Sequence, residues 1–290
     1  MNKPVVAAAG HTIGDAPAAT LARIEAQCTR LTTSSVSGSI VWRRWGSGPP
    51  LVLLHGGYGS WRHWIRTIPA FASSRTVLVP DLPGLGDSGD VPETITPEHI
   101  AAIITDGFER LIKTCTPIDL VGFSFGALIA GHVAARAGPA LRSLTLVGAG
   151  ALGTPHGEVQ LAKARPGIST AELREIHRIN LSRLMIADTA KIDQLAILIQ
   201  YENTRRARMK SRRLALTDSL AQALHRGAPK RLHAIWGERD QSAGTYIPER
   251  EAVLRSLCPD LRSRLVPNAG HWVAYEAPES FNPILEEFLA

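Results

Sequence analysis

The chain has 290 residues, 44% of them hydrophobic, so it can bury a large core as one domain or as a core with an insertion. No window approaches the roughly 18 uninterrupted apolar residues of a membrane-spanning helix, and the apolar run at 5–10 is too short for a secretory signal. Three scattered cysteines without metal-ligand spacing predict reduced thiols, no metal site and a cytoplasmic location: Cys28, Cys115 and Cys258.

Positive charge is concentrated in one stretch of the chain. Residues 151–228 hold 13 Lys or Arg and 7 Asp or Glu, which accounts for the whole net charge of +6. Its densest part, 205–213, is interpreted first as the solvated face of a helix and second as a surface that attracts an anionic substrate. Because no aromatic residue is interleaved and no nucleic-acid-binding motif surrounds it, no nucleic-acid partner is expected.

The chain in order begins with a predicted helix over Ala18–Gln27 and two edge strands, Thr29–Thr33 and Ser39–Trp45, joined by a Ser/Gly turn. The strands that follow are short, almost continuously apolar runs at 51–54, 77–79, 118–121, 144–147, 232–236 and 264–266. Runs that do not alternate belong to strands buried on both faces, as in a parallel sheet covered by helices.

Helices are predicted between these strands. Thr96-Pro97-Glu98 is a helix start signal, with an N-cap hydroxyl, a proline at the first helical position and an acid in the first turn. Further helices are expected after Ser124, ending at Gly138, and over 248–257 and 278–289. This alternation predicts an α/β fold with a doubly wound, mostly parallel sheet.

One connection is too long for a single crossover. Because 89 residues separate the strand starts at 143 and 232, residues 151–228 are predicted to form an inserted helical cap. Its helices are expected over 171–186, 191–203 and 205–225. The core domain then has two parts, residues 1–150 and 229–290.

Gly122-Phe123-Ser124-Phe125-Gly126 lies between a predicted strand and a helix-forming stretch. Glycines flank the turn because a Cβ at either place would clash as the backbone reverses. Such a turn lifts the Ser124 hydroxyl clear of the sheet, and the helix N-terminus directs its dipole and free N–H groups at the same point. Ser124 is the predicted nucleophile.

A serine nucleophile needs a base and an orienting acid, expected here in loops after later strands. Asp240 follows the strand at 232, and His271 follows the last strand. Both loops lie at carboxyl ends of parallel strands, where an open α/β sheet binds ligands. Glu238 is a rival acid, but Asp240 lies deeper in the loop and is preferred.

An oxyanion needs two N–H donors. Phe125, directly after the nucleophile, supplies one. The second is expected from the loop after the strand at 51, where glycines let the backbone approach a substrate; Gly57 is preferred and Gly56 is the alternative. His55 is interpreted as a residue that orients this loop through hydrogen bonds.

From Leu51 to the C-terminus the chain resembles α/β-hydrolase-fold serine hydrolases. The motifs that carry the resemblance occur in that family's order: His55-Gly56-Gly57, Asp81 to Ser88, the serine turn, Gly237 to Asp240 and Gly270-His271-Trp272. The resemblance implies a cofactor-free Ser-His-Asp hydrolase with a cap over its pocket. Serine at position 124 disfavours the dehalogenase and epoxide-hydrolase branches, which place aspartate there.

Within that fold, the Gly-Gly-x-Gly-Ser-Trp loop and the Gly270 to Glu276 segment are similar to esterases and to hydrolases that cleave C–C bonds of meta-cleavage dienoates. The latter use a lid arginine for the substrate carboxylate and usually carry Asn before the nucleophile, where this chain has Phe123. Aromatic side chains near the site are interpreted as an apolar acyl pocket, with plain core packing as the alternative: Phe123, Phe125, Tyr58 and Trp272.

The sequence therefore predicts a serine hydrolase acting on a small ester, thioester or lactone, with a small-molecule carbonyl substrate that is neutral or anionic. A C–C hydrolase, a perhydrolase or haloperoxidase, and a non-catalytic small-molecule receptor on the same fold remain alternatives. The G-x-G-x-x-G match at 84–89 is interpreted as a turn, since it does not open into a helix. No membrane partner is expected, and a homodimer stays open.

Overall fold

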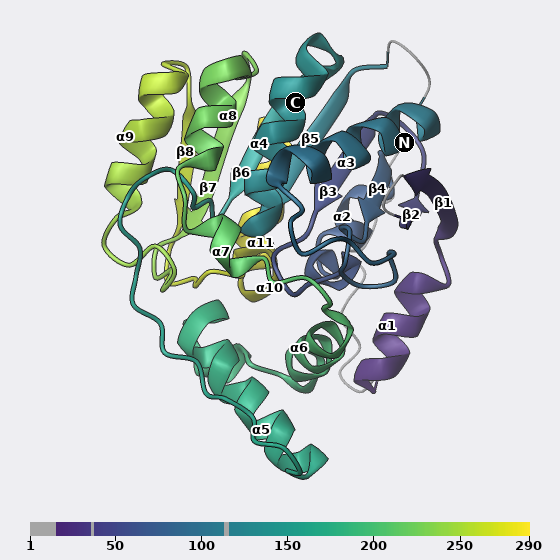
Figure 1. The fold of residues 1–290 in the computed structure, drawn as a ribbon, viewed down its shortest axis with the longest axis vertical. Helices are drawn as coiled ribbons and strands as arrows, with labels where there is room; N and C mark the ends of the chain where they lie inside the picture. The colour runs from purple at the N-terminus through teal and green to yellow at the C-terminus, as the bar shows by residue number, and fades with distance from the viewer. Residues whose placement is uncertain (1–15, 36–37, 113–115) are drawn as a thin grey trace, which may run out of the picture.

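An eight-stranded sheet runs through the centre of the computed structural model, which describes residues 16–35, 38–112 and 116–290 (Figure 1). The strand order is β1-β2-β4-β3-β5-β6-β7-β8, antiparallel at β1–β2 and β2–β4 and parallel elsewhere. The strands are β1 (Thr29–Ser35), β2 (Gly38–Trp45), β3 (Pro50–Leu54), β4 (Thr76–Pro80), β5 (Ile118–Phe123), β6 (Leu141–Val147), β7 (Leu232–Gly237) and β8 (Arg262–Val266). The predicted turn between the first two strands, Cys115 and the start of the chain lie outside the described residues.

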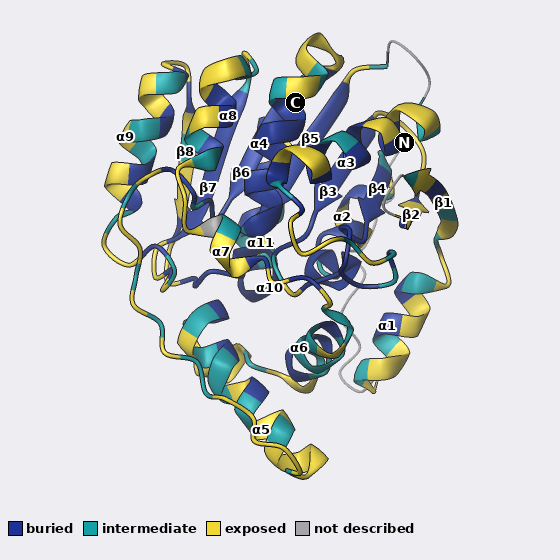
Figure 2. Cartoon of the chain, viewed as in Figure 1, coloured by how far each residue is buried: buried dark blue, intermediate teal, exposed yellow. Residues whose placement is uncertain are grey.

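Two hydrophobic cores lie on the two faces of the sheet, because its central strands carry apolar side chains on both sides; β3, β5 and β7 are buried at every residue (Figure 2). One core holds side chains of α3 (Pro97–Leu111), α4 (Phe125–Ala137), α8 (Ser219–Gly227) and α9 (Ile247–Leu257). The other holds side chains of α1 (Pro17–Glu25), α2 (Ile68–Phe71), α6 (Gln194–Arg206), α10 (Val273–Glu276) and α11 (Pro278–Leu289). The predicted doubly wound α/β sheet is confirmed, and so is the Thr96 N-cap, whose hydroxyl accepts the His99 N–H.

The predicted helix over 205–225 is wrong. Helix α6 ends at Arg206, residues 207–211 are not helical, and the short α7 (Arg212–Ala215) precedes α8. The backbone leaves the helix because Arg208 is held by the loop at 84–90: its N–H donates to Gly84 O (2.9 Å), and its guanidinium binds Gly86 O and Asp90. Arg206 pairs with Asp87 at 2.5 Å. These two arginines therefore fasten the segment to the core and do not form a solvated helix face.

Helix α5 (Thr170–Asn180) packs against α6 and lies at the lower end of the view in Figure 1. The π-helical turn Leu181–Met185 that follows it contributes Leu181 and Met185 to the second core. Helix α8 instead packs along α4. The division of the chain at residues 150 and 228 stays a prediction. In the described part of the chain, no helix is both long and apolar enough to cross a bilayer.

Arg43 in β2 is buried against three carboxylates. Its guanidinium lies 2.7 Å from Glu25, 3.0 Å from Asp81 and 2.5 Å from Asp87. Asp81 also accepts the Trp61 N–H at 2.8 Å, so this ion cluster ties β2 to the loops after β3 and β4. Removing the cation alone leaves the buried Asp81 carboxylate without its ion-pair partner.

We expect Arg43→Ala to lower the free energy of unfolding by about 3–5 kcal/mol, the cost of breaking a buried ion pair from one side. The neighbouring Arg44 is exposed, so Arg44→Ala is the control and should change stability by less than about 0.5 kcal/mol. Urea unfolding of the wild type and both variants measures the difference. Equal midpoints for all three would contradict this role of Arg43.

Candidate active site

The turn between β5 and α4 holds Ser124 in an unusual backbone conformation, with φ 52° and ψ −114°. Non-glycine residues rarely adopt it, and it persists only where the surroundings impose it. A Cβ on Gly122 would lie 2.3 Å from Gly126 O, and one on Gly126 would lie 2.4 Å from Leu54 O. Strand and helix thus meet backbone to backbone, and the Ser124 side chain projects from the turn.

Three predicted residues form one chain of hydrogen bonds. The Nδ1–H of His271 donates to Asp240 Oδ2 at 2.8 Å, so Nε2 accepts from the Ser124 hydroxyl at 2.9 Å. Asp240 follows β7 and His271 follows β8, so the two loops meet Ser124 at the carboxyl edge of the sheet. A neutral imidazole in this tautomer can take the hydroxyl proton.

Asp240 is fully buried but well supplied with donors. Its Oδ1 accepts the Ser242 N–H (2.8 Å), the Ser242 hydroxyl (2.7 Å) and the Ala243 N–H (3.2 Å). Burial alone would raise the pKa of the Asp240 carboxyl, but His271 and these Ser242 groups outweigh it, so the pKa lies below its usual range. Asp240 is therefore ionised at neutral pH. Sequence reasoning missed Ser242, although Ser two residues after Asp is typical of an Asx turn.

The rival acid lies elsewhere. Glu238 is exposed, and its Oε2 accepts the Asn268 N–H at 2.9 Å, while its own N–H donates to Val266 O. Glu238 thus joins the two loops at their base, and Asp240 is the acid that contacts His271.

The predicted oxyanion donors are neighbours. Phe125 is the first residue of α4, so its N–H has no partner within the helix. A Cβ on Gly57 would lie 3.5 Å from Phe125 Cβ and 2.3 Å from Ser211 Oγ, so the Gly57 backbone runs close beside the nucleophile turn. His55 accepts the Leu82 N–H at Nε2 (2.9 Å), and its Nδ1–H donates to Gly56 O (2.8 Å), as expected of a residue that orients this loop.

A cavity of about 200 Å³ opens at Ser124 and His271. Tyr58 and Phe123 line it, and the centroid of the Phe123 ring lies 5.0 Å from that of His271. Most other lining side chains are apolar: Leu128, Val159, Leu161, Leu184, Met185 and Leu216.

Trp272 was predicted to line the pocket, and this is wrong. Its indole is fully buried behind the cavity, where Nε1 donates to His63 O (2.8 Å) and the ring stacks on Tyr275. His63 lines the cavity instead, and no sequence signal marks it. Because His63 Nδ1 accepts the Gly56 N–H, its ring proton is on Nε2. Burial, then the charges of His55 and His271, hold the pKa of His63 well below its usual value.

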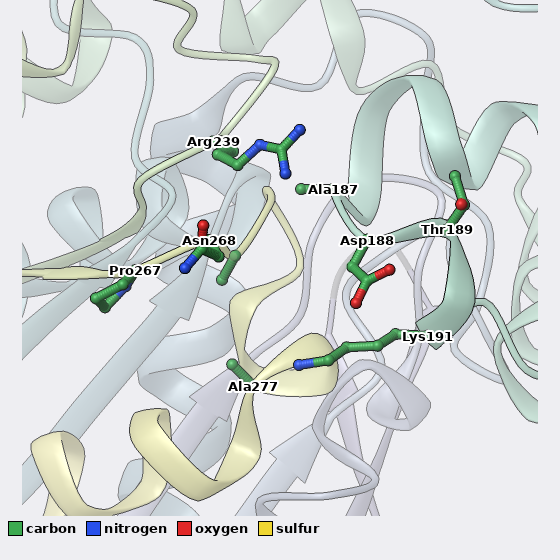
Figure 3. Close-up of a pocket in the computed structure, with 9 residues that line it drawn as sticks. Ala187, Asp188, Thr189, Lys191, Arg239, Pro267, Asn268 and Ala277 are labelled. Carbon is green, nitrogen blue, oxygen red and sulfur yellow. The ribbon is translucent and has the colours of Figure 1, made fainter.

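A second cavity, of about 370 Å³, is lined by polar groups from two segments, 187–191 and 267–269, together with Arg239 and Ala277 (Figure 3). It contains none of the residues of the hydrogen-bonded chain, so the chemistry is assigned to the first cavity. Among the described residues, no group of His, Cys, Asp and Glu is arranged to hold a metal ion.

Comparisons with known proteins agree with this fold. The sequence pattern of the alpha/beta hydrolase family matches residues 51–284. The 2-hydroxymuconate semialdehyde hydrolase of Pseudomonas sp. (strain CF600) is 28% identical over 261 residues, which is 84% of this chain and 88% of that protein. A putative lipase from Acinetobacter baumannii AYE has a TM-score of 0.75 at 20% identity, covering 96% of this chain and 97% of that one. Naproxen esterase from Bacillus subtilis has a TM-score of 0.70 at 17% identity, covering 94% and 97%.

We expect Asp240→Asn to lower kcat by roughly 10⁴-fold, because an amide no longer selects the His271 tautomer that accepts the serine proton. Glu238→Gln is the matched control and should keep kcat close to the wild-type value, since Glu238 does not touch His271. Turnover of p-nitrophenyl acetate by both variants measures the difference. A larger loss in Glu238→Gln than in Asp240→Asn would reverse the assignment of the acid.

Proposed function

The chain belongs to the alpha/beta hydrolase family, and we propose that it is a serine hydrolase that cleaves a small ester, thioester or lactone through an acyl-enzyme on Ser124. The observation that carries the proposal is the continuous hydrogen-bond chain from Asp240 through His271 to Ser124, which ends at an apolar cavity. That arrangement provides a nucleophile, a base and an orienting anion at one point.

The geometry supports the following acylation of Ser124. As Ser124 Oγ attacks the substrate carbonyl carbon, its proton passes to His271 Nε2, and the carbonyl π electrons move to the oxygen. The N–H groups of Phe125 and Gly57 stabilise that oxyanion. The buried Asp240 carboxylate stabilises the imidazolium. The tetrahedral intermediate then collapses, the bond to the leaving group breaks, and His271 gives its proton to that group.

Deacylation uses the same groups with water as nucleophile. His271 takes a proton from water as the water oxygen attacks the acyl carbon, and the oxyanion forms between the same two donors. Collapse breaks the bond to Ser124 Oγ, which receives the proton back from His271. The products are the free acid and the resting serine.

The size and lining of the cavity favour a substrate with a small acyl group and a carboxylate. At about 200 Å³ with a mostly apolar lining, it suits a short acyl chain. Arg212 also lines the cavity; it is exposed and has no ion-pair or hydrogen-bond partner among the described residues. The other lining arginine, Arg250, donates to Ala149 O and Ser242 O. Arg212 is thus the cation we propose for a substrate carboxylate.

Hydrolysis of a C–C bond is the second candidate, because a relative matched over 84% of this chain is a 2-hydroxymuconate semialdehyde hydrolase. Phe123 before the nucleophile makes the pocket less polar there and favours the ester proposal. The absorbance of 2-hydroxymuconate semialdehyde, followed during incubation with the protein, separates the two candidates. A loss of absorbance indicates C–C hydrolysis.

We expect the wild type to release a burst of p-nitrophenol from p-nitrophenyl acetate or butyrate, followed by slower steady turnover, because acylation precedes hydrolysis. Ser124→Ala should abolish the burst, and mass spectrometry should find the acyl group on Ser124 in the wild type. Absence of a burst and of turnover on both esters would overturn the ester proposal; retained ligand binding without turnover would favour a receptor.

We expect Arg212→Ala to raise KM for mono-p-nitrophenyl succinate roughly tenfold. This is the low end for a hydrogen bond to a charged group, because solvent screens the exposed Arg212 side chain. KM for neutral p-nitrophenyl butyrate should stay unchanged. Arg213→Ala removes a neighbouring exposed charge that does not line the cavity and is the control. Equal effects of the two variants would point to general charge attraction instead of a contact.

A further inference from the structure

Glu276, at the end of α10, has a buried carboxylate that accepts three backbone N–H groups from two separate segments. Its Oε2 accepts from Gly270 (2.7 Å) and Ala187 (3.0 Å), and its Oε1 accepts from Asp188 (2.8 Å). We propose that Glu276 is a positioning residue that holds the backbone next to His271 against the segment 184–188, part of which lines the substrate cavity. This inference rests on the proposed function.

The two segments each lead directly to the site. Gly270 precedes His271, and Leu184 and Met185, just before Ala187, line the catalytic cavity. The segments touch through backbone: the Trp272 N–H donates to Met185 O at 2.7 Å, and a Cβ on Gly270 would lie 2.7 Å from Ala187 N. A shift of one segment therefore moves the other.

Beside this contact, the second cavity lies between the two segments. The second cavity is lined by Ala187 and Asp188 on one side and by Asn268 and Ala269 on the other, as Figure 3 shows for the labelled residues. The carboxylate of Glu276 thus joins the two segments at the border of a space that protein atoms do not fill. Lys191 reinforces the same place by donating to Glu276 O at 3.0 Å.

A carboxylate is the side chain that this place requires. All three of its partners are donors, and an ionised carboxylate accepts at both oxygens and donates at neither. Glutamine has the same shape, but its NH₂ group must face either the Asp188 N–H or the pair on Oε2. In the first orientation the Asp188 N–H loses its acceptor, and in the second the Gly270 and Ala187 N–H groups lose theirs. Either orientation weakens the link between the two segments while the fold around it keeps its packing.

The reaction is sensitive to such a loss. His271 Nε2 lies 2.9 Å from Ser124 Oγ, and proton transfer needs this distance at the moment of attack. A displacement of about 1 Å can cost on the order of 10²-fold in rate. Glu276 touches neither substrate nor the reacting atoms. Its loss should therefore slow the reaction at each Ser124 and leave the number of reactive Ser124 groups unchanged.

The test compares Glu276→Gln with Glu279→Gln, whose carboxylate is exposed and lies 3.8 Å from the same Lys191. A fluorophosphonate probe that labels Ser124 gives both the number of reactive sites and the rate constant of labelling. We expect Glu276→Gln to label to the same final extent as the wild type, with a rate constant lowered roughly 10- to 100-fold. Glu279→Gln should match the wild type.

A purely structural role gives the opposite pattern, with fewer reactive sites and an unchanged rate constant, and would overturn the proposal. If Glu276→Gln does not fold, Glu276→Asp carries the test: its shorter side chain cannot reach both segments, and its labelling should also be slowed. Misfolding of both variants would likewise establish a structural role. A wild type that is not labelled at Ser124 would overturn the proposed function as well, whereas a labelled wild type with equally fast Glu276→Gln overturns this inference alone.

Discussion

The backbone contact at the turn between β5 and α4 is the constraint on which the site depends. A Cβ on Gly122 would lie 2.3 Å from Gly126 O, and a Cβ on Gly126 would lie 2.4 Å from Leu54 O in β3. This closeness imposes the strained conformation of Ser124 and starts α4 directly behind it. Because β3 pairs with β5, the loop at Gly57 is brought next to the same turn. The positions of Ser124 and of the two proposed oxyanion donors thus follow from the close packing at this turn.

The order of strands in the sheet brings the remaining groups to that point. The loops after β3, β5, β7 and β8 carry Gly57, Ser124, Asp240 and His271, and β6 lies between β5 and β7. The residue after β6, Gly148, passes under the histidine: a Cβ there would lie 2.9 Å from His271 Cε1. Five neighbouring strands, all parallel, therefore build the site at one edge.

Local patterns predicted the strands, the sheet and the positions of Ser124, Asp240 and His271, because apolar runs and tight turns are encoded within a few residues. The predictions failed where contacts between residues far apart in the sequence determine the local structure. The helix over 205–225 is broken by Arg208 reaching the loop at 84–90. Neither His63 nor Glu276 could be placed, since their partners are backbone N–H groups, which every residue has. Trp272 turned inward because the backbone of His63 offers its indole an acceptor.

The packing of α8 on α4 limits how the stretch between β6 and β7 could be exchanged for that of another protein. By sequence α8 belongs to the stretch between β6 and β7, yet Leu220 fits against Gly131 of α4, where a Cβ would lie 2.1 Å from its Cδ1. A chimera spliced at the strand ends would strip this support from the helix that begins at the nucleophile. Any exchange of the stretch between β6 and β7 should therefore keep α8 with its own core. It must also replace the bonds by which Arg206 and Arg208 hold residues 151–218 to the loop at 84–90.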